Sequence, residues 1–227
     1  MAKEEHVLLL KKGITIWNKW REENPAIFPD LSKADLRGTD LNYADLSRAN
    51  LREAVLSGEH CATYDYYDYG YENADLIEVN LNAADLRGAK LNACRLVGGN
   101  LSKANLQGAT LSRSNLSQAN FCNSNLSQAN LSQADLSGAD FSGANLSGCD
   151  LNGARLEGTS LSGAKLQGVD LCGADLGKAN FSDTDFSRAD LSDGKNLLEN
   201  QLETAHLCKT KLPKGIHLDF DRDCSNI

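Results

Sequence analysis

Large apolar residues recur at every fifth position along most of this chain. Steps of five from Leu31 to Leu191 give 33 positions, and 30 of them hold Leu or Phe. The three exceptions fall together within residues 59–73. Outside that interruption, the 29 positions that lie two residues earlier hold 19 Ala, and otherwise only Gly, Ser, Thr, Cys or Val. Asp or Asn usually comes between the two, so the repeating unit is A-[DN]-L-x-x.

A period of five suits neither a helix nor a flat strand. Residues five apart on an α-helix differ by about 140°, so the leucines would spiral around it instead of forming one stripe. On a flat strand they would point alternately to opposite faces. A short fixed repeat therefore predicts a solenoid, in which each turn buries its apolar side only by stacking on its neighbours. The small residue beside each Leu indicates a second inward position in a narrow core.

The tandem A-[DN]-L-x-x units resemble those of the pentapeptide repeat proteins and cover about four fifths of the chain. The resemblance implies an all-β fold, a right-handed parallel quadrilateral β-helix (a solenoid), in which four pentapeptides make one coil. Residues twenty apart then stack at about the ordinary 4.8 Å spacing of strands. Phe121 and Phe141 are twenty apart, so we expect them to form a stack in the core.

The ends of such a solenoid expose unpaired sheet edges and need caps. Residues 1–24 predict an N-terminal α-helical cap, since Asn24-Pro25 ends the segment and Gly13 permits two shorter helices. Apolar residues at helical spacing mark its buried face, namely Val7, Leu10, Ile14 and Trp17. An amphipathic helix of this kind binds a membrane surface or partner, or covers the first coil; we favour the cap. Its G-x-x-x-W-N-x-W-R pattern also resembles the N-terminal extension of many pentapeptide repeat proteins.

We assign residues 25–212 to the β-helix and 213–227 to a C-terminal tail. After Leu191 the leucines fall one residue late, which indicates a helical kink over 194–202. Cys208 and Cys224 flank a short segment near the end, so a disulfide between them and a pair of free thiols are both open. Of the other cysteines, Cys94 and Cys149 occupy the small inward position, and Cys122 and Cys172 should lie outside the core.

The interruption carries five of the six tyrosines of the chain. A Tyr at the small inward position would not fit, so we expect an irregular loop at 58–74 and not a regular coil. Tyrosines beside acidic residues suit contact with a basic partner, although they could instead fold back and shield the rod. The candidate partner-binding residues are Tyr64, Tyr66, Tyr67, Tyr69, Tyr71, Asp65, Asp68 and Glu72. The spacing of His60, Cys61, Asp65 and Asp68 matches no metal site, so we expect no metal.

Composition and charge limit the classes of function. A net charge of −8 disfavours direct binding to nucleic acid. The chain has no apolar run long enough to span a membrane and does not begin with a secretory signal, so we expect a cytoplasmic protein. No nucleophile, phosphate-loop or zinc-hydrolase motif is present, which predicts no enzymatic activity, no catalytic residue and no cofactor.

We therefore expect a non-catalytic protein-interaction scaffold with an unidentified protein partner, present as a monomer or weak dimer. The family resemblance offers an alternative, because some pentapeptide repeat proteins are acidic rods that mimic DNA and bind a DNA-handling enzyme such as gyrase. A DNA mimic should carry a continuous acidic stripe. No Asp or Glu lies between Val97 and Ala134, so the charge distribution favours the scaffold.

Overall fold

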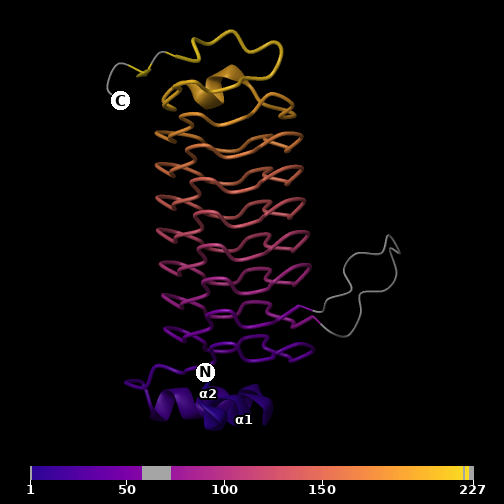
Figure 1. Cartoon of the computed structure of the whole chain (residues 1–227), viewed down its shortest axis with the longest axis vertical. Coiled ribbons are helices and arrows are strands. Elements are labelled where there is room, and N and C mark those ends of the chain that lie inside the picture. The colour runs from indigo at the N-terminus through magenta and orange to yellow at the C-terminus, as the bar shows by residue number, and fades with distance from the viewer. Residues whose placement is uncertain (1, 58–72, 222, 225–227) are drawn as a thin grey trace, which may run out of the picture.

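The computed structural model describes residues 2–57, 73–221 and 223–224. Two helices, α1 (Glu4–Lys11) and α2 (Ile14–Glu23), lie across one end of a stack of coils, and a short 3-10 helix, η1 (Glu199–Leu202), lies at the other (Figure 1). Among the described residues, no helix is both long and apolar enough to cross a membrane.

The coils are joined by isolated parallel bridges, each one residue long. Through most of the rod a residue pairs with the one twenty positions later, as Asn105 does with Asn125 and Asn125 with Asn145. The Asn125 N–H donates to the coil before it, and the N–H of the adjacent Leu126 donates to the coil after it, at 2.9 and 2.7 Å. The coils inside the rod are therefore hydrogen-bonded on both sides, and four columns of bridges run along the rod.

A tight turn between bridges bends the chain at each side of the coil. The carbonyl of Leu136 accepts a 3.0 Å hydrogen bond from the N–H of Ala139, three residues on. The third residue of nearly every such turn has a positive φ, for example 66° at Gly138 and 61° at Gln128. These features define a type II turn, whose third position favours glycine. The frequent Gly at the last position of the repeat follows from this backbone requirement.

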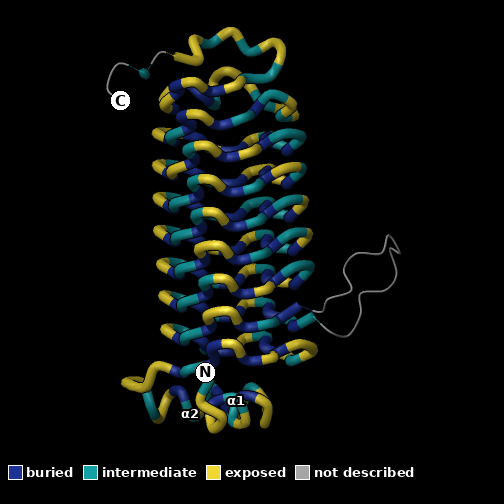
Figure 2. Tube along the Cα trace, in the orientation of Figure 1, coloured by how far each residue is buried: buried dark blue, intermediate teal, exposed yellow. Residues whose placement is uncertain are grey.

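The inward positions form one continuous core. The Leu and Phe side chains of the repeat are at most 1% exposed, and the buried and exposed positions alternate along every coil (Figure 2). Phe121 and Phe141 are stacked with their ring centroids 4.5 Å apart and their planes within 3°. Where the small position holds a buried Ser or Thr, its hydroxyl is satisfied by the backbone: Thr159 Oγ1 donates to the Leu136 carbonyl at 2.8 Å. The core therefore tolerates Ser or Thr in place of Ala.

The Asp or Asn before each Leu holds the turn that follows it. The Oδ1 atom of Asp140 accepts hydrogen bonds from the Ser142 N–H at 2.9 Å and from its hydroxyl at 2.5 Å. The same Asx-type contact recurs at Asn115 with Ser117 and at Asp190 with Ser192. A side-chain oxygen at this position thus orders the backbone two residues further on. Asp and Asn both supply that oxygen, which explains why the repeat accepts either residue here.

The stack is continuous across the interruption. Asp40 pairs with Asp75 and Val55 pairs with Lys90, so partners here are thirty-five residues apart instead of twenty. The N–H of Ala74 donates to the Leu56 carbonyl at 2.7 Å, the bond that a small residue makes to the Leu three positions earlier in a regular repeat. Ala74 therefore occupies the place that residue 59 would have in an uninterrupted chain.

Helix α2 satisfies the open edge of the first coil through its side chains. The Trp17 indole donates to the Asp45 carbonyl at 2.9 Å, and the Asn18 amide donates to the Tyr43 carbonyl at 3.0 Å. Asn18 Oδ1 also accepts the Asp45 N–H at 2.9 Å. These side chains take the place of the coil that would otherwise lie beneath, so the W-N-x-W-R segment is a cap fixed by hydrogen bonds.

Two further buried side chains complete this cap. Arg21, 5% exposed, donates to the Ile27 carbonyl at 2.6 Å and to the Ser47 carbonyl at 3.1 Å. His6, on α1, accepts the Asp30 N–H at its Nδ1 atom at 3.0 Å. The edge groups at this end are therefore paired within the chain, which hinders end-to-end association through the sheet edge.

At the other end the register shifts by one residue, as the late leucines predict. Asp185 pairs with His206 and Asp190 with Lys211, twenty-one residues apart. The predicted kink contains η1, whose Gln201 side chain donates to the Leu176 carbonyl at 2.9 Å.

The tail then folds back over the last coil. Asp223 accepts the Leu207 N–H at 2.8 Å and Asp221 accepts the Lys209 N–H at 3.0 Å, so carboxylates replace the missing next coil. A disulfide between Cys208 and Cys224, whose Cα atoms are 4.9 Å apart, joins the tail to that coil.

Leu136 tests the inward column directly. Leu136→Ala should lower the free energy of unfolding by about 2–5 kcal/mol, because it leaves a cavity in a core that cannot collapse without breaking the ladder. Gln107→Ala, at an exposed position, is the matched control and should change it by no more than about 0.5 kcal/mol. Chemical denaturation measures both; equal effects in the two variants would mean that Leu136 does not support the fold.

Asp190 tests the electrostatics of the turns. Its pKa is lowered to about 2, first by the Lys211 ammonium, 2.6 Å from Oδ2, and then by Ser192. Because this value lies below the unfolded pKa of about 3.9, its contribution to stability is complete above about pH 4 and disappears as the pH falls toward 2. Carboxyl NMR titration should find the low value in the wild type and a higher one in Lys211→Gln. An unchanged pKa in that variant would exclude the ion pair as the main cause.

Candidate functional site

One side of the rod carries a column of aspartates in its C-terminal half. Asp150 pairs with Asp170, and Asp170 with Asp190, so the three lie directly above one another; we call them the acidic column. Asp193 lies close by, two residues after the next inward Leu, and is exposed. Of the three, Asp190 has an ion-pair partner in Lys211, at the C-terminal end. Among the described residues, no Lys or Arg lies within ion-pair distance of the other two.

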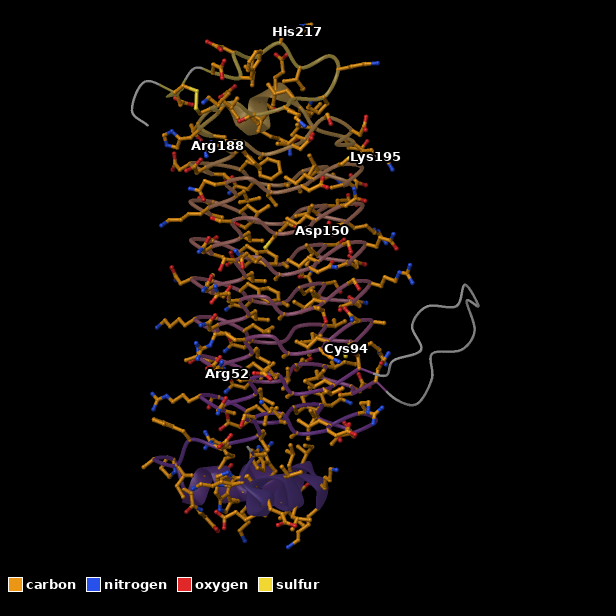
Figure 3. The ribbon with its side chains drawn as sticks, viewed as in Figure 1. Arg52, Cys94, Asp150, Arg188, Lys195 and His217 are labelled. Carbon is orange, nitrogen blue, oxygen red and sulfur yellow. A yellow bond between two sulfur atoms is a disulfide. The ribbon has the colours of Figure 1, made fainter. Side chains whose placement is uncertain are left out.

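The adjacent side of the same coils shows the opposite arrangement. Asp135, Arg155, Asp175 and Lys195 stack in that order, and we call them the alternating column. Arg155 lies 3.6 Å from the Asp135 carboxylate. The hydrogen bond from Asn196 is the main cause of the lowered pKa of Asp175, and the charges of Arg155 and Lys195 add to it. Figure 3 marks Asp150 near the middle of the rod and Lys195 nearer its C-terminal end.

The two remaining sides are almost neutral through the middle of the rod. One carries an amide ladder in which each Asn Nδ2 donates to the Asn Oδ1 below at 3.3 Å. Its members are Asn105, Asn125 and Asn145. The other side stacks Asn80, Asn100 and Asn120. The sides of the rod therefore differ in charge although the backbone beneath them is the same.

The two charged columns have opposite consequences for stability. Two like charges about 5 Å apart at a surface repel by roughly 1 kcal/mol or less, and like charges directly opposite in a sheet are destabilising. The alternating column gains a similar small amount for each attractive pair. The acidic column thus opposes folding mildly. Asn would make the same turn hydrogen bond without the repulsion, since Asn serves that role in many other repeats.

The negative field of the acidic column also reaches a thiol. The Cys172 thiol, 3.3 Å from Asp193, donates to this carboxylate, and the charges of Asp193, Asp170 and Asp190 add to raise its pKa. The other free thiols also resist ionisation where a shift is resolved. Burial raises the pKa of Cys149 to about 12, and burial together with the Asp140 carboxylate raises that of Cys122 to about 11. A thiol that stays protonated is a poor nucleophile and a poor metal ligand.

The residues proposed for partner binding in the interruption lie outside the described residues. They are Tyr64, Tyr66, Tyr67, Tyr69, Tyr71, Asp65, Asp68 and Glu72, and their role stays a prediction. Gly58, the expected start of the loop, lies outside as well. Within the part of the chain that is described, no cluster of three or more His, Cys, Asp or Glu side chains is placed to hold a metal ion.

The charged columns and the capping contacts were not anticipated from the sequence, although a signal for the columns was present. Once a coil of twenty residues is assumed, Asp150, Asp170 and Asp190 fall in one column by arithmetic alone. The contacts of Asn18 and Arg21 carried no such signal, because they depend on how the helices lie over the first coil.

Solved proteins with this fold resemble the chain at low sequence identity. QnrB1, a plasmid-mediated fluoroquinolone resistance protein, shares 16% identity over 82% of this chain and 89% of its own, with a TM-score of 0.59. HetL from the cyanobacterium Nostoc sp. strain PCC 7120, which is involved in heterocyst differentiation regulation, shares 25% identity over 88% of this chain and 98% of its own, with a TM-score of 0.31. The likeness to QnrB1 shows the fold alone. No curated protein sequence matches the chain.

A sequence profile of pentapeptide repeats matches in eight copies, over residues 28–58, 74–113, 114–153, 139–177 and 154–193. The first two matches leave out the interruption and resume at Ala74, the residue at which the ladder resumes. The profile covers more than half of the sequence, and the four-sided parallel stack agrees with the quadrilateral β-helix of these proteins. The chain belongs to the pentapeptide repeat family.

Proposed function

We propose that this protein is a non-catalytic interaction scaffold whose acidic column binds a protein partner with a basic surface. The column is formed by Asp150, Asp170 and Asp190, and it is the one observation that carries the proposal. A partner that brings Lys or Arg to these carboxylates relieves their mutual repulsion. This relief contributes to the free energy of binding. Electrostatic complementarity of this kind speeds association and selects the partner.

The rigidity of the rod supports the same function. Asp150 and Asp170 each accept a backbone hydrogen bond, from the N–H groups of Asn152 at 3.0 Å and Cys172 at 2.8 Å. Their side chains are therefore held in place before a partner arrives, and little conformational entropy is lost on binding. The bridges fix the spacing between carboxylates at about 4.8 Å, which suits an extended basic segment or a regularly spaced row of basic side chains.

The charge distribution does not favour a DNA mimic. The acidic column occupies only the C-terminal half of one side, and nearer the N-terminus the same column holds Lys90, Thr110 and Asn130. The adjacent alternating column is mixed in sign. The likeness to QnrB1 concerns the fold and brings no charge pattern with it, so we keep the scaffold as the proposed function.

A role of the tyrosine-rich segment in partner binding stays a prediction. Its acidic residues would favour the same class of basic partner as the acidic column. A test of the acidic column must therefore distinguish its contribution to binding from that of residues 59–73.

Asp150→Asn/Asp170→Asn tests the proposal. The variant keeps the turn hydrogen bonds and removes two negative charges, so thermal or chemical unfolding should show equal or greater stability than the wild type. In affinity capture from a lysate of the native host, it should lose the proteins that the wild type retains in a salt-sensitive manner.

Asp135→Asn/Asp175→Asn is the charge-matched control, since it removes two aspartates from the alternating column. It should be less stable than the wild type and should retain the same partners. Loss of partners in both double variants would show that binding depends on the net charge of the protein and not on the acidic column. Retention in the acidic-column variant would refute the proposal, and loss only in a variant lacking residues 59–73 would assign recognition to that segment.

A further inference from the structure

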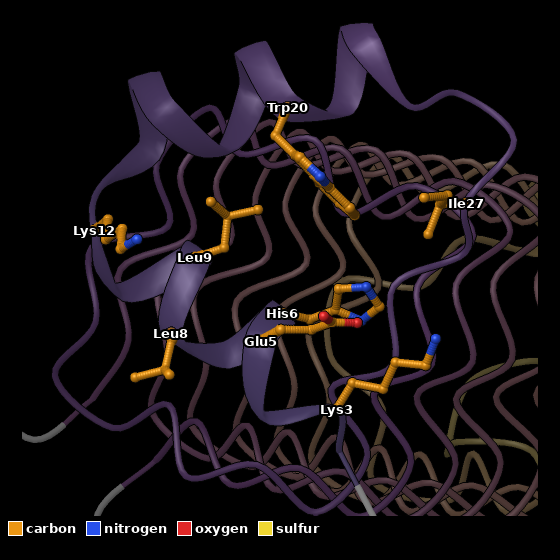
Figure 4. A pocket seen from close by; sticks show the side chains of 8 residues that line it. All are labelled: Lys3, Glu5, His6, Leu8, Leu9, Lys12, Trp20 and Ile27. Atoms are coloured by element: carbon orange, nitrogen blue, oxygen red, sulfur yellow. The ribbon is translucent and has the colours of Figure 1, made fainter.

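The N-terminal cap contains a pocket that the interaction function does not use. It lies between α1, α2 and the chain that leads to the first coil, and has a volume of about 470 Å³ (Figure 4). Its apolar walls come from Leu8, Leu9, Trp20 and Ile27. Leu8 is 54% exposed and Ile27 38% exposed, so apolar surface remains uncovered at its mouth. The volume is sufficient for a small organic molecule.

A buried histidine presents an unused donor to this pocket. His6 is 3% exposed and lines the pocket, with its ring 5.3 Å from that of Trp20. Its Nδ1 atom accepts the Asp30 N–H at 3.0 Å, so the proton of the neutral ring is on Nε2. Among the described residues, no group accepts a hydrogen bond from Nε2. This nitrogen is not among the fully buried side-chain atoms that lack a partner, so it opens onto the pocket, where a bound acceptor can receive its hydrogen bond.

The charges around the pocket favour an anionic acceptor. Lys3 and Lys12 line it, against a single carboxylate from Glu5, so the lining is net positive in a protein of net charge −8. In Figure 4 the two lysines lie on opposite sides of His6, and Trp20 reaches toward it from α2. Apolar walls with a few polar groups that converge on one point are typical of small-molecule sites.

We infer that the cap pocket binds a small carboxylate with an apolar body, such as a medium-chain fatty acid. The carboxylate accepts the hydrogen bond from His6 Nε2, with Lys3 and Lys12 supplying the positive potential. The chain or ring of the ligand packs against Trp20, Leu9 and the exposed faces of Leu8 and Ile27. A ligand here bridges α1 and α2 and stabilises the cap that closes the sheet edge.

The two tryptophans of the protein supply the readout. Trp20 lines the pocket, whereas the Trp17 indole is fully buried and bonded to the Asp45 carbonyl at 2.9 Å. In a ¹H–¹⁵N NMR titration of the full chain with octanoate, the Trp20 indole signal should shift saturably and the Trp17 signal should not. Octylammonium and acetate, which lack the charge or the chain, should produce no saturable shift at the same concentrations.

His6→Asn tests the donor. The Asn oxygen can still accept the Asp30 N–H while the Nε2 donor is removed, so octanoate affinity should fall about tenfold or more, as for loss of a charged hydrogen bond. Lys12→Gln, at an exposed site, should weaken binding about two- to fivefold without any effect on folding. An unshifted Trp17 signal in each variant shows that the cap is intact.

The inference is overturned if octanoate gives no saturable shift, or if octylammonium binds equally well, which would indicate a nonspecific apolar surface. Unchanged affinity in a folded His6→Asn variant would also overturn it. If that variant loses the native Trp17 signal, Lys12→Gln decides: weaker octanoate binding supports the site, and equal binding refutes it.

Discussion

The hydrogen bonds between neighbouring coils are the constraint on which the rest of this structure depends. Each bridge residue donates backward and each inward Leu donates forward, as Asn125 and Leu126 do. This ladder fixes one spacing and one direction for the whole rod, so a small residue and a large apolar residue must alternate inside it. This requirement explains the five-residue pattern in the sequence.

The same ladder creates the problem that both ends solve. An unpaired sheet edge would recruit another chain, and here side chains from outside the repeat occupy it. Trp17, Asn18 and Arg21 cap the first coil, and Asp221 and Asp223 cap the last. Three of the five positions in each repeat do not point into the core. At these positions the charge of each side can vary without disturbing the fold.

The periodicity of the sequence made the core predictable, but it carries little information about the ends and the surfaces of the rod. The inward column, the stacked pair Phe121 and Phe141, and the late register after Leu191 follow from counting in fives and twenties. The polar contacts of His6 and Arg21 depend on helix placement, which a repeat does not encode. The acidic column needed the coil length as well as the sequence, because Asp150 and Asp170 become neighbours only when twenty residues make one coil.

The most direct test is a seamless deletion of residues 59–73, which joins Gly58 to Ala74 and restores an unbroken A-[DN]-L-x-x pattern. The ladder already runs from Leu56 to Ala74, so the shortened chain contains every coil of the rod. Thermal unfolding followed by circular dichroism should show one cooperative transition with a midpoint within about 5 °C of the wild type, a shift of roughly 1 kcal/mol or less. Loss of the cooperative transition would show that the stack requires those fifteen residues and would contradict the continuous ladder.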